Sequence, residues 1–189
     1  MSQALLDLLR EKFGAQILET SSQFGDETAV VAPAAWRAVA LFLRDDPACR
    51  MTMMVDLCGS DYLGRTPRFE VVLHLYSLEK GHRLRLKARV GDAEGEAVEV
   101  DSLVSVWPGA NWFEREAFDM FGIVFAGHPD LRRILLYPEF EGHPLRKDYP
   151  ADRVQPLVPF REGYEKQPPF DRFEGMSFGR NALPKGTVE

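Results

Sequence analysis

Two stretches in the first half of the chain alternate between apolar and polar residues with the two-residue period of a β-strand. In the first stretch, the apolar side chains are Phe69, Val71, Leu73 and Leu75. In the second, the apolar residues Leu84, Leu86, Ala88 and Val90 alternate with the basic residues Arg83, Arg85, Lys87 and Arg89. The segment 77–81 has the length of a hairpin loop, so the pattern predicts two antiparallel strands, at 68–76 and 82–90, each with one buried face.

Two segments nearer the N-terminus carry apolar residues at the spacing of three and four that places them on one face of a helix. The first begins at Ser2, a good N-cap residue, and ends near Gly14. Its apolar positions are Leu5, Leu8 and Leu9. The second begins with Pro33, ends at 45–47, and has its apolar positions at Trp36, Val39, Ala40 and Leu43. We therefore predict two amphipathic helices ahead of the hairpin.

Three shorter apolar stretches, 28–32, 51–57 and 96–101, have the length and composition of further strands. Two early helices followed by strands that are mostly linked as hairpins are typical of an α+β fold. In that class the helices pack on one face of a mostly antiparallel sheet, and we predict this arrangement for the chain.

Proline becomes frequent toward the C-terminus, where eight of the thirteen prolines fall in the last 52 residues. Because proline lacks a backbone donor and disfavours helix in the residue before it, we predict an α+β domain over 1–137 and a long, extended, proline-rich tail over 138–189. The tail also carries aromatic residues at Phe160, Tyr164, Phe170, Phe173 and Phe178. Spaced rings on extended chain suit anchoring to a partner's surface; a tail that folds back on its own domain, or disorder, is the alternative.

The row of basic residues on the strand 82–90 has two interpretations. It can be the solvated face of a half-buried strand, partly balanced by Glu70 on the neighbouring strand. It can also be a docking stripe for an acidic partner. Alternation by itself requires a polar face, so the pattern does not separate the two.

Composition narrows the class of protein. The chain has 189 residues, enough for one domain with a core, and a net charge of −6, which argues against a nucleic-acid binder. Its two cysteines, Cys49 and Cys58, are too few for a disulfide framework, a tetrahedral zinc site or an iron–sulfur cluster, and we expect them to be buried. The sequence contains neither the ~18-residue apolar run of a membrane helix nor the pattern of a secretory signal, so we expect a soluble protein of a reducing compartment.

The most informative segment is 111–122, which is predicted to be a helix that begins at Asn111. Glu114 follows Asn111 at the spacing of a capping box, while Arg115 and Asp119 are four residues apart and can pair. Large apolar residues occupy more than one side of this helix, at Trp112, Phe113, Phe118, Met120 and Phe121. Such a helix is expected to be covered on two sides, and the second cover is either its own fold or another protein.

His128 and His143 each lie in a Gly-His-Pro tripeptide, on either side of a short apolar stretch. We expect them to be turn residues or interface hydrogen-bond donors rather than metal ligands. Together with Asp119 and Asp148 they could also form an acid–base site, because histidine titrates near neutral pH. The sequence offers no activated-nucleophile motif and no glycine-rich phosphate loop beside them. A stand-alone acid–base enzyme that uses His128 and His143 therefore stays as an alternative from another class.

The order and spacing of these residues resemble a known family. The run Glu114-Arg115-Glu116, Asp119-Met120-Phe121, His128, Arg132 and Ile134-Leu135 is similar to the signature of the C subunit of bacterial NADH-quinone oxidoreductase, respiratory complex I. The segments 56–62 and 141–150 are similar to the segments upstream and downstream of that signature. The resemblance covers about positions 50–150.

The resemblance implies a hydrophilic scaffold subunit of the peripheral arm with an α+β fold, in the form that is not fused to the D subunit. In that family the chain holds no flavin, cluster or quinone-reducing residue; FMN, the iron–sulfur clusters and the quinone site belong to partner subunits. The chain packs against the D subunit and lies close to the B subunit, at the cytoplasmic face of the bacterial inner membrane, with which it associates only through the complex. The whole complex couples electron transfer from NADH to quinone with proton translocation.

From this resemblance we expect no catalytic, cofactor-binding or metal-binding residue in the chain itself. The expected interface residues are Glu114, Arg115, Glu116, Asp119, His128, Arg132, Arg133, His143, Arg146, Lys147 and Asp148. The acidic and basic residues of the helix 111–122 would fix that helix and its contacts, and the later charged residues would supply polar docking groups. The equivalent subunit of a membrane-bound hydrogenase or formate hydrogenlyase is the alternative within the same homologous group.

Overall fold

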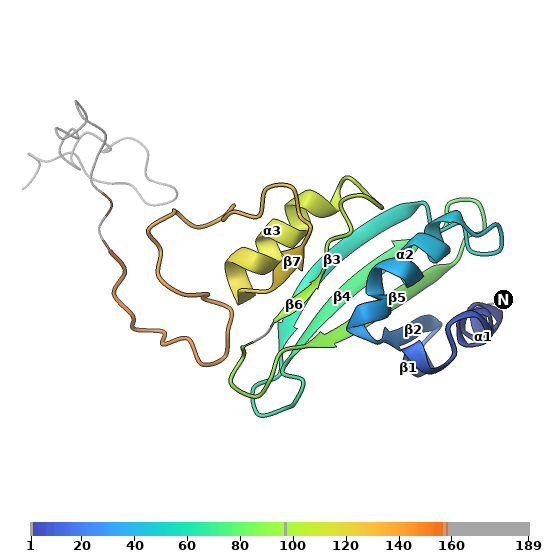
Figure 1. Cartoon of the computed structure of the whole chain (residues 1–189), viewed down its shortest axis with the longest axis horizontal. Coiled ribbons are helices and arrows are strands. Elements are labelled where there is room, and N and C mark those ends of the chain that lie inside the picture. The colour runs from blue at the N-terminus through green and yellow to red at the C-terminus, as the bar shows by residue number, and fades with distance from the viewer. Residues whose placement is uncertain (1, 97, 157, 159–189) are drawn as a thin grey trace, which may run out of the picture. The chain divides into compact units, whose positions relative to one another are not determined.

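The computed structural model describes residues 2–96, 98–156 and 158, and the chain up to Gln155 forms one compact unit (Figure 1). The helices of this part are α1 (Ser2–Phe13), η1 (Gly14–Gln16), η2 (Pro33–Ala35), α2 (Trp36–Asp45) and α3 (Ala110–Phe121), η1 and η2 being single 3₁₀ turns. The strands are β1 (Ile17–Gln23), β2 (Asp26–Val31), β3 (Met53–Asp61), β4 (Phe69–Tyr76), β5 (Arg83–Val90), β6 (Glu99–Asp101) and β7 (Val124–Ala126).

Five of the strands form one sheet in the order β1-β2-β5-β4-β3. The predicted hairpin of β4 and β5 is present, with Leu73 opposite Leu86 at its centre. The pairs β1–β2 and β3–β4 are also antiparallel, while β2 and β5 run parallel. The short strands β6 and β7 pair with each other in a separate parallel ribbon. The predicted α+β class with a mostly antiparallel sheet is confirmed.

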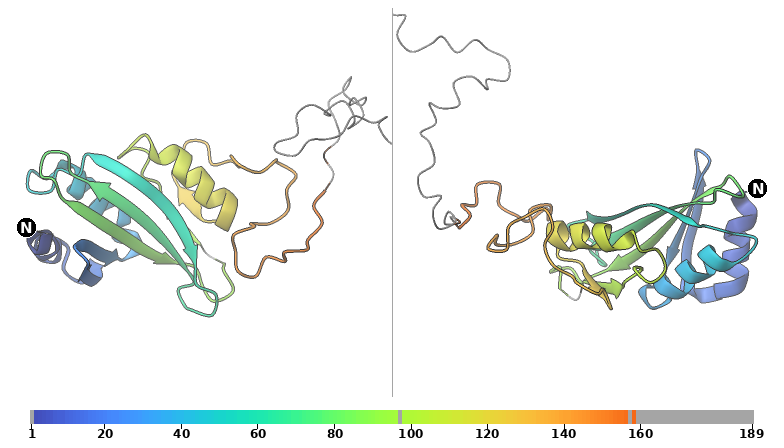
Figure 2. Two further views of the ribbon diagram at one scale, coloured as in Figure 1. Left: turned by 180° about the vertical axis from the view of Figure 1, so that it is seen from behind. Right: turned by 90° about the horizontal axis from the view of Figure 1, so that it is seen from above.

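The core lies between the sheet and its helices. Helices α1 and α2 cover one face of the sheet, as the view from behind shows, and α3 packs beside the edge strand β3 (Figures 1 and 2). Fully buried side chains from each layer meet here, among them Leu9, Trp36, Leu43, Leu73 and Leu86. The alternation found in the sequence thus separates this core face from a polar face, which no helix of the described residues covers.

Two strands were not predicted. The residues of β1 are mostly exposed and do not alternate, so the strand is formed by its pairing with β2 rather than by burial of one face. The strand β7 has only three residues and pairs with β6. The predicted strand at 51–57 begins at Met53 and continues to Asp61, because its second half pairs with the start of β4. Cys49 is buried as expected, whereas Cys58 is only partly buried.

The described residues after 137 contain no helix or strand, and the compact unit includes them as far as Gln155. The predicted division at 137 therefore does not coincide with the end of the compact unit. The tail residues predicted to act as anchors, Phe160, Tyr164, Phe170, Phe173 and Phe178, lie outside the described residues. In the described part of the chain, every helix is too short or too polar to cross a membrane.

Gly59 in β3 marks the closest approach of the end of α3 to the sheet. A β-carbon at this position would lie 2.8 Å from Cδ2 of Phe121 and 2.9 Å from Cδ1 of Ile123. These distances are shorter than non-bonded carbon atoms tolerate, so the close contact depends on the missing side chain.

We expect the substitution Gly59→Ala to lower the free energy of unfolding by roughly 1–3 kcal/mol, because Phe121 and Ile123 must shift to admit the methyl group. Gly109→Ala is the matched control, since its β-carbon would meet only Cε of Met54, at 3.7 Å. Urea denaturation of both variants measures the effect. Equal stabilities of the two variants would contradict this account of the contact.

Candidate partner-binding site around helix α3

The side chain of Glu114 points into the protein. The predicted capping box with Asn111 is therefore wrong, and the helix begins one residue earlier without a side-chain cap. Glu114 is fully buried, and its carboxyl group accepts hydrogen bonds from the hydroxyl of Ser102 at 2.7 Å and from the backbone N–H of Leu103 at 2.6 Å. The loop after β6 is thereby attached to α3.

Burial raises the pKa of Glu114 to about 7, because the loss of hydration disfavours the charged form more than its two hydrogen bonds favour it. This carboxyl group has no ion pair with a basic residue in the described part of the chain. Its charge near neutral pH is therefore balanced only by hydrogen-bond donors.

Asp119 is the second buried carboxylate of α3. The backbone N–H groups of residues 134–136 donate to one of its oxygens at 2.9–3.0 Å, and the guanidinium group of Arg133 donates to the other at 2.7 Å. Burial alone would raise the pKa of Asp119, but these donors hold it below its ordinary value. The predicted pairing of Asp119 with Arg115 is wrong, because the carboxylate is used to fold the segment that follows β7.

Arg115 reinforces the same attachment from the other direction. Its guanidinium group donates to the backbone carbonyls of Arg132 and Arg133, each at 3.1 Å. It also lies over the ring of Trp112, with 5.6 Å between the guanidinium carbon and the ring centroid. Arg115 and Asp119 thus bind carbonyl and N–H groups of one short stretch of backbone.

The C-terminal end of α3 is capped by two side chains from further along the chain. Arg146 donates to the carbonyl of Phe121 at 2.7 Å, and Nδ1 of His143 donates to the carbonyl of Asp119 at 3.0 Å. A positive charge here also complements the negative end of the helix dipole. Gly122 is needed at this point, because its φ of +75° is left-handed and a β-carbon would lie 2.7 Å from the ring of His143.

A buried ion pair attaches the next residues to the sheet. Arg68 donates to both oxygens of Asp61, at 2.8 and 2.7 Å, and both side chains are almost completely buried. Arg68 also donates to Asp148 at 2.9 Å, and the N–H of Lys147 donates to Asp61 at 2.7 Å. The hydrogen bonds from Arg68 lower the pKa of Asp61 and of Asp148. Neither Arg68 nor Asp61 was among the predicted site residues: Asp61 lies in the segment 56–62 that resembles the family and Arg68 begins the predicted strand 68–76, but neither position marks a buried charge.

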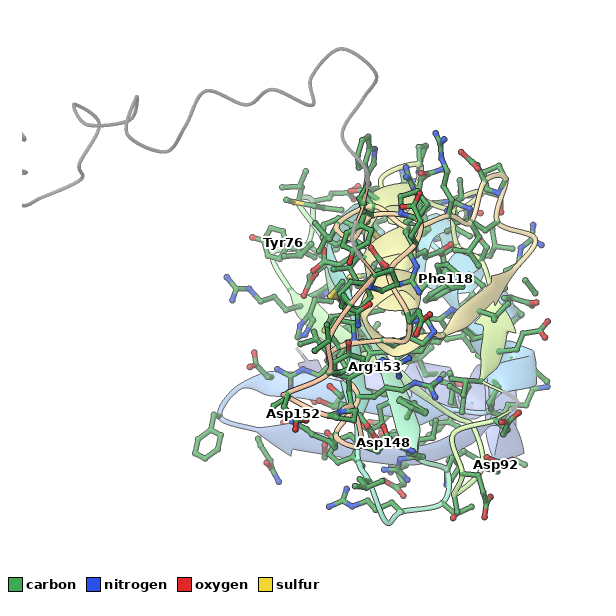
Figure 3. The ribbon with its side chains drawn as sticks, turned by 90° about the vertical axis from the view of Figure 1, so that its left-hand side faces the viewer. Tyr76, Asp92, Phe118, Asp148, Asp152 and Arg153 are labelled. Carbon is green, nitrogen blue, oxygen red and sulfur yellow. The ribbon has the colours of Figure 1, made fainter. Side chains whose placement is uncertain are left out.

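We call residues 127–149 the wrapping segment, since they pass around α3 and return to the sheet. Figure 3 shows the molecule from this side, with Phe118 on α3 and Asp148 on the wrapping segment labelled. The segment has no helix or strand after β7, and polar contacts from α3 and from the sheet edge hold it in place. These hydrogen bonds and ion pairs hold the backbone of the wrapping segment in one conformation, although its residues favour neither helix nor strand.

The two histidines lie at opposite ends of α3. Nε2 of His128 donates to the carbonyl of Asn111 at 3.2 Å, while His143 binds the carbonyl of Asp119. Eight residues of helix separate these carbonyls, which is about 12 Å along the axis. The structure does not bring the histidines together as one acid–base pair, and burial lowers the pKa of His143. In the described part of the chain, His, Cys, Asp and Glu form no group of three or more that could hold a metal ion.

The predicted interface residues fall into two sets. The first set makes contacts within the chain and consists of Glu114, Arg115, Asp119, His128, Arg133, His143, Arg146 and Asp148. The second set consists of Glu116, Arg132 and Lys147, whose side chains are exposed and of which Arg132 has only a surface ion pair with Asp130. A substitution at Arg146 would therefore test folding rather than docking. The role of the exposed set at an interface stays a prediction.

Large apolar side chains of α3 and of the wrapping segment are exposed as well. Trp112 on α3 is 64% exposed, and Leu135 and Leu145 on the wrapping segment are 62% and 51% exposed. Aromatic and aliphatic side chains that a fold leaves in water are typical of surfaces that another protein covers. These three residues, with Glu116, Arg132 and Lys147, define the α3 surface.

The contacts around α3 define a class of α+β domain in which charged residues of one helix fasten the following segment of the same chain to the sheet. The chain belongs to the family of the respiratory-chain NADH dehydrogenase 30 Kd subunit, whose family model matches residues 29–155.

Several curated proteins are similar to the chain, and each is named as the C subunit of NADH-quinone oxidoreductase. The relative from Roseiflexus castenholzii is 56% identical over 143 residues, which cover 75% of this chain and 80% of the relative. The relative from a Methylobacterium species is 49% identical over 148 residues, covering 78% and 67%. For the relative from Xanthobacter autotrophicus the identity is 54% over 127 residues, covering 67% of this chain and 59% of the relative.

One solved structure shares the fold. A chain in the structure of the membrane-bound sulfane sulfur reductase, an archaeal respiratory membrane complex, matches with a TM-score of 0.66. The match covers 87% of this chain and 98% of that chain at 21% sequence identity. The likeness therefore concerns the arrangement of helices and strands.

We expect Glu114→Gln to change how stability depends on pH. The native state keeps the Glu114 proton up to about pH 7, whereas the unfolded chain releases it near the ordinary value of 4.5. The native state thus binds more protons in this window, so the contribution is fully present below pH 4.5 and is lost as the pH rises to 7. The free energy of unfolding of the wild type, minus that of Glu114→Gln, should fall by about 2.5 kcal/mol between pH 5 and pH 8. A flat difference would mean that Glu114 is charged throughout.

We expect Asp119→Asn to free the backbone of residues 134–136 and to cost roughly 3 kcal/mol of stability, because the amide cannot accept all the hydrogen bonds of the carboxylate and leaves Arg133 without a counter-charge. Hydrogen exchange at these amides should become faster than in the rest of the core. Asp130→Asn is the control, since Asp130 pairs with Arg132 at the surface. Unchanged exchange at 134–136 in Asp119→Asn would refute the attachment.

Proposed function

We propose that the chain is the C subunit of an NADH-quinone oxidoreductase, respiratory complex I. The observation that carries the proposal is its 56% identity, over 143 residues, to a protein of that name from Roseiflexus castenholzii. The complex as a whole would transfer electrons from NADH to quinone and couple this transfer to proton translocation.

Within such a complex the chain would be a non-catalytic scaffold that docks on the D subunit near the B subunit. The use of Asp119, Arg133 and Arg146 in structural contacts supports this role, because these groups are occupied rather than free for chemistry. FMN, the iron–sulfur clusters and the quinone would be held by the partner subunits. A rigid scaffold would keep those groups at fixed separations.

The α3 surface is our candidate for the docking contact. It combines an exposed indole ring, two exposed leucines and charges of both signs, a composition found at interfaces with a few strong apolar anchors and a polar rim. We further propose that the chain lies at the cytoplasmic face of the cell membrane and reaches the membrane only through its partners.

A second candidate is the equivalent subunit of a related membrane-bound respiratory complex with another electron donor, such as a hydrogenase or formate hydrogenlyase. The likeness in fold to a chain of the archaeal sulfane sulfur reductase favours it, with a TM-score of 0.66. Identification of the companion subunits decides between the two candidates. Companions that bind NADH and FMN support complex I, and hydrogenase or formate dehydrogenase companions support the alternative.

The experiment is purification of the tagged full chain from native membranes of a strain in which it replaces the untagged copy. We expect the other subunits of the complex and NADH:quinone turnover to co-purify with it, while the chain expressed alone shows no redox turnover. A redox centre bound by the isolated chain would contradict the scaffold role, and purification without any companion would contradict the whole proposal.

We expect the double variant Trp112→Ala, Arg132→Glu to lower the amount of chain in the purified complex at least tenfold, because it removes the largest exposed ring and reverses a charge on the α3 surface. Its melting temperature should stay close to that of the wild type, since both side chains are mostly exposed. Leu63→Ala is the control for loss of an exposed apolar side chain elsewhere, as Leu63 is 53% exposed. Normal incorporation of the double variant would rule out the α3 surface as the docking contact.

A further inference from the structure

The polar face of the sheet, which is free of helices in the described part of the chain, carries a hollow beside the β1–β2 hairpin. The hairpin projects from this face in the view from above (Figure 2), and Tyr76 points outward on the same side in Figure 3. The hollow has a volume of about 510 Å³. Its lining includes Asp26, Met53, Val55, Tyr76, Arg83 and Arg85. We call it the hairpin hollow.

The basic row of β5 is divided into two halves by its contacts. Lys87 and Arg89 both bind Glu70, at 2.8 and 3.1 Å, and Arg89 also binds Glu19 at 2.7 Å. This half is therefore the balanced polar face of a strand, which was the first of the two interpretations drawn from the sequence.

The other half of the row faces the hairpin hollow with less compensation. Arg83 has no ion pair with a carboxylate of the described residues, and its guanidinium group lies over the ring of Tyr76 at 5.8 Å. Arg85 is 3.6 Å from Asp26, a long ion pair at the surface. His74 adds no charge near pH 7, because burial and the neighbouring Arg85 lower its pKa. Asp26 and Glu27 also line the hollow, so what it offers is one guanidinium group, that of Arg83, without a carboxylate partner among the described residues.

The floor of the hollow is apolar and lies on an edge strand. Met53 and Val55 of β3 are 44% and 49% exposed there. The register of β3 against β4 shifts between Met54 and Asp56, so that Val55 is an extra residue without a partner opposite it. The hollow therefore offers apolar surface next to the unpaired guanidinium group of Arg83.

The tip of the β1–β2 hairpin carries a residue, Phe24, whose side chain is unfavourable in the backbone conformation of the turn. Phe24 and Gly25 connect β1 and β2, and both have positive φ, at +56° and +86°, the pattern of a two-residue type I′ turn. Asn and Gly adopt this conformation most readily, whereas a bulky residue with a β-carbon is strained in it. The ring of Phe24 is also completely exposed. A strained, unburied aromatic side chain lowers the stability of the isolated chain, which points to a role outside it.

We propose that the hairpin hollow and Phe24 together dock a segment of another protein that carries a carboxylate and a large apolar side chain. The carboxylate binds Arg83, the apolar side chain covers Met53 and Val55, and Phe24 inserts into the surface of the partner beside the segment. The partner is another subunit of the parent complex, so this inference rests on the proposed function. An anionic membrane fits less well, because the two cations stand beside acidic residues rather than in a cluster of four to eight basic ones.

The test compares four single variants of the tagged full chain, each replacing the untagged copy in cells. Arg83→Glu and Phe24→Asn probe the docking surface. Lys80→Glu is the control for charge reversal. Lys80 lies in the loop between β4 and β5, close in sequence to Arg83, but it lines a recess near α1 instead of the hairpin hollow. Leu78→Asn is the control for loss of an exposed apolar side chain, as Leu78 is 69% exposed in that loop. The amount of chain per complex is measured by quantitative mass spectrometry after purification through a different subunit.

We expect Arg83→Glu and Phe24→Asn each to lower the amount of chain per complex at least threefold, and the two controls to leave it unchanged. Phe24→Asn should at the same time raise the melting temperature of the purified chain, by about 2–4 °C, because asparagine relieves the strained turn. A gain in stability together with a loss of docking is not expected from a residue with a purely structural role.

A photoreactive phenylalanine analogue at position 24 identifies what covers the hairpin. A crosslink to another subunit of the complex supports the proposal, and a crosslink to lipid or to a second copy of the chain overturns it. Wild-type amounts of Arg83→Glu or of Phe24→Asn in the complex also overturn it. If the wild-type chain itself is absent from the complex, the proposed function fails instead, so the two failures are distinguishable.

Discussion

The architecture around α3 depends on the requirement that a buried carboxylate be surrounded by hydrogen-bond donors. Glu114 and Asp119 are both completely buried, yet they lie on a helix whose other large side chains are mostly apolar. An unsatisfied buried charge would cost several kcal/mol, so each carboxylate fixes the backbone that supplies its donors. Asp119 does this for residues 134–136, where local propensity favours no regular structure. The folded wrapping segment supplies the N–H donors for the buried carboxylate of Asp119, and the same hydrogen bonds hold the segment in its conformation.

The two carboxylates meet this requirement differently. Asp119 has a guanidinium partner and three N–H donors, and its pKa is lowered. Glu114 has a hydroxyl and a single N–H, and burial raises its pKa. The attachment of the loop after β6 is therefore sensitive to pH near neutrality, while the attachment of the wrapping segment is not. Helix α3 thus carries Asp119, which stays charged near neutral pH, toward its C-terminal end, and Glu114, which titrates near neutral pH, toward its N-terminal end.

Much of the fold follows from the period of the apolar residues, and much of the site does not. The strand β5 buries every second residue, so its pattern survives folding unchanged, whereas β4 buries Phe69, Val71, Leu73 and Leu75 in the core and also Glu70 and Val72 on its other face. The strand β1 buries almost nothing and exists through its hydrogen bonds to β2, for which the sequence has no signal. The predictions of a capping box at Asn111 and Glu114 and of an Arg115–Asp119 pair were wrong for a related reason. Local spacing treats a charged side chain as a surface group, but Arg133, 14 residues beyond Asp119, is the better partner once Asp119 is buried.

The same reasoning separates residues that hold the fold from residues that face outward. A charged group engaged by several partners of its own chain cannot bind a second protein without losing them, and this applies to Asp119, Arg133 and Arg68. A group that is exposed and lacks compensation, such as Arg83, loses only water on binding. The signature that characterises the family in the sequence is therefore concentrated on the internal framework. The surfaces free to meet partners lie on either side of it, on the outer face of α3 and on the uncovered face of the sheet.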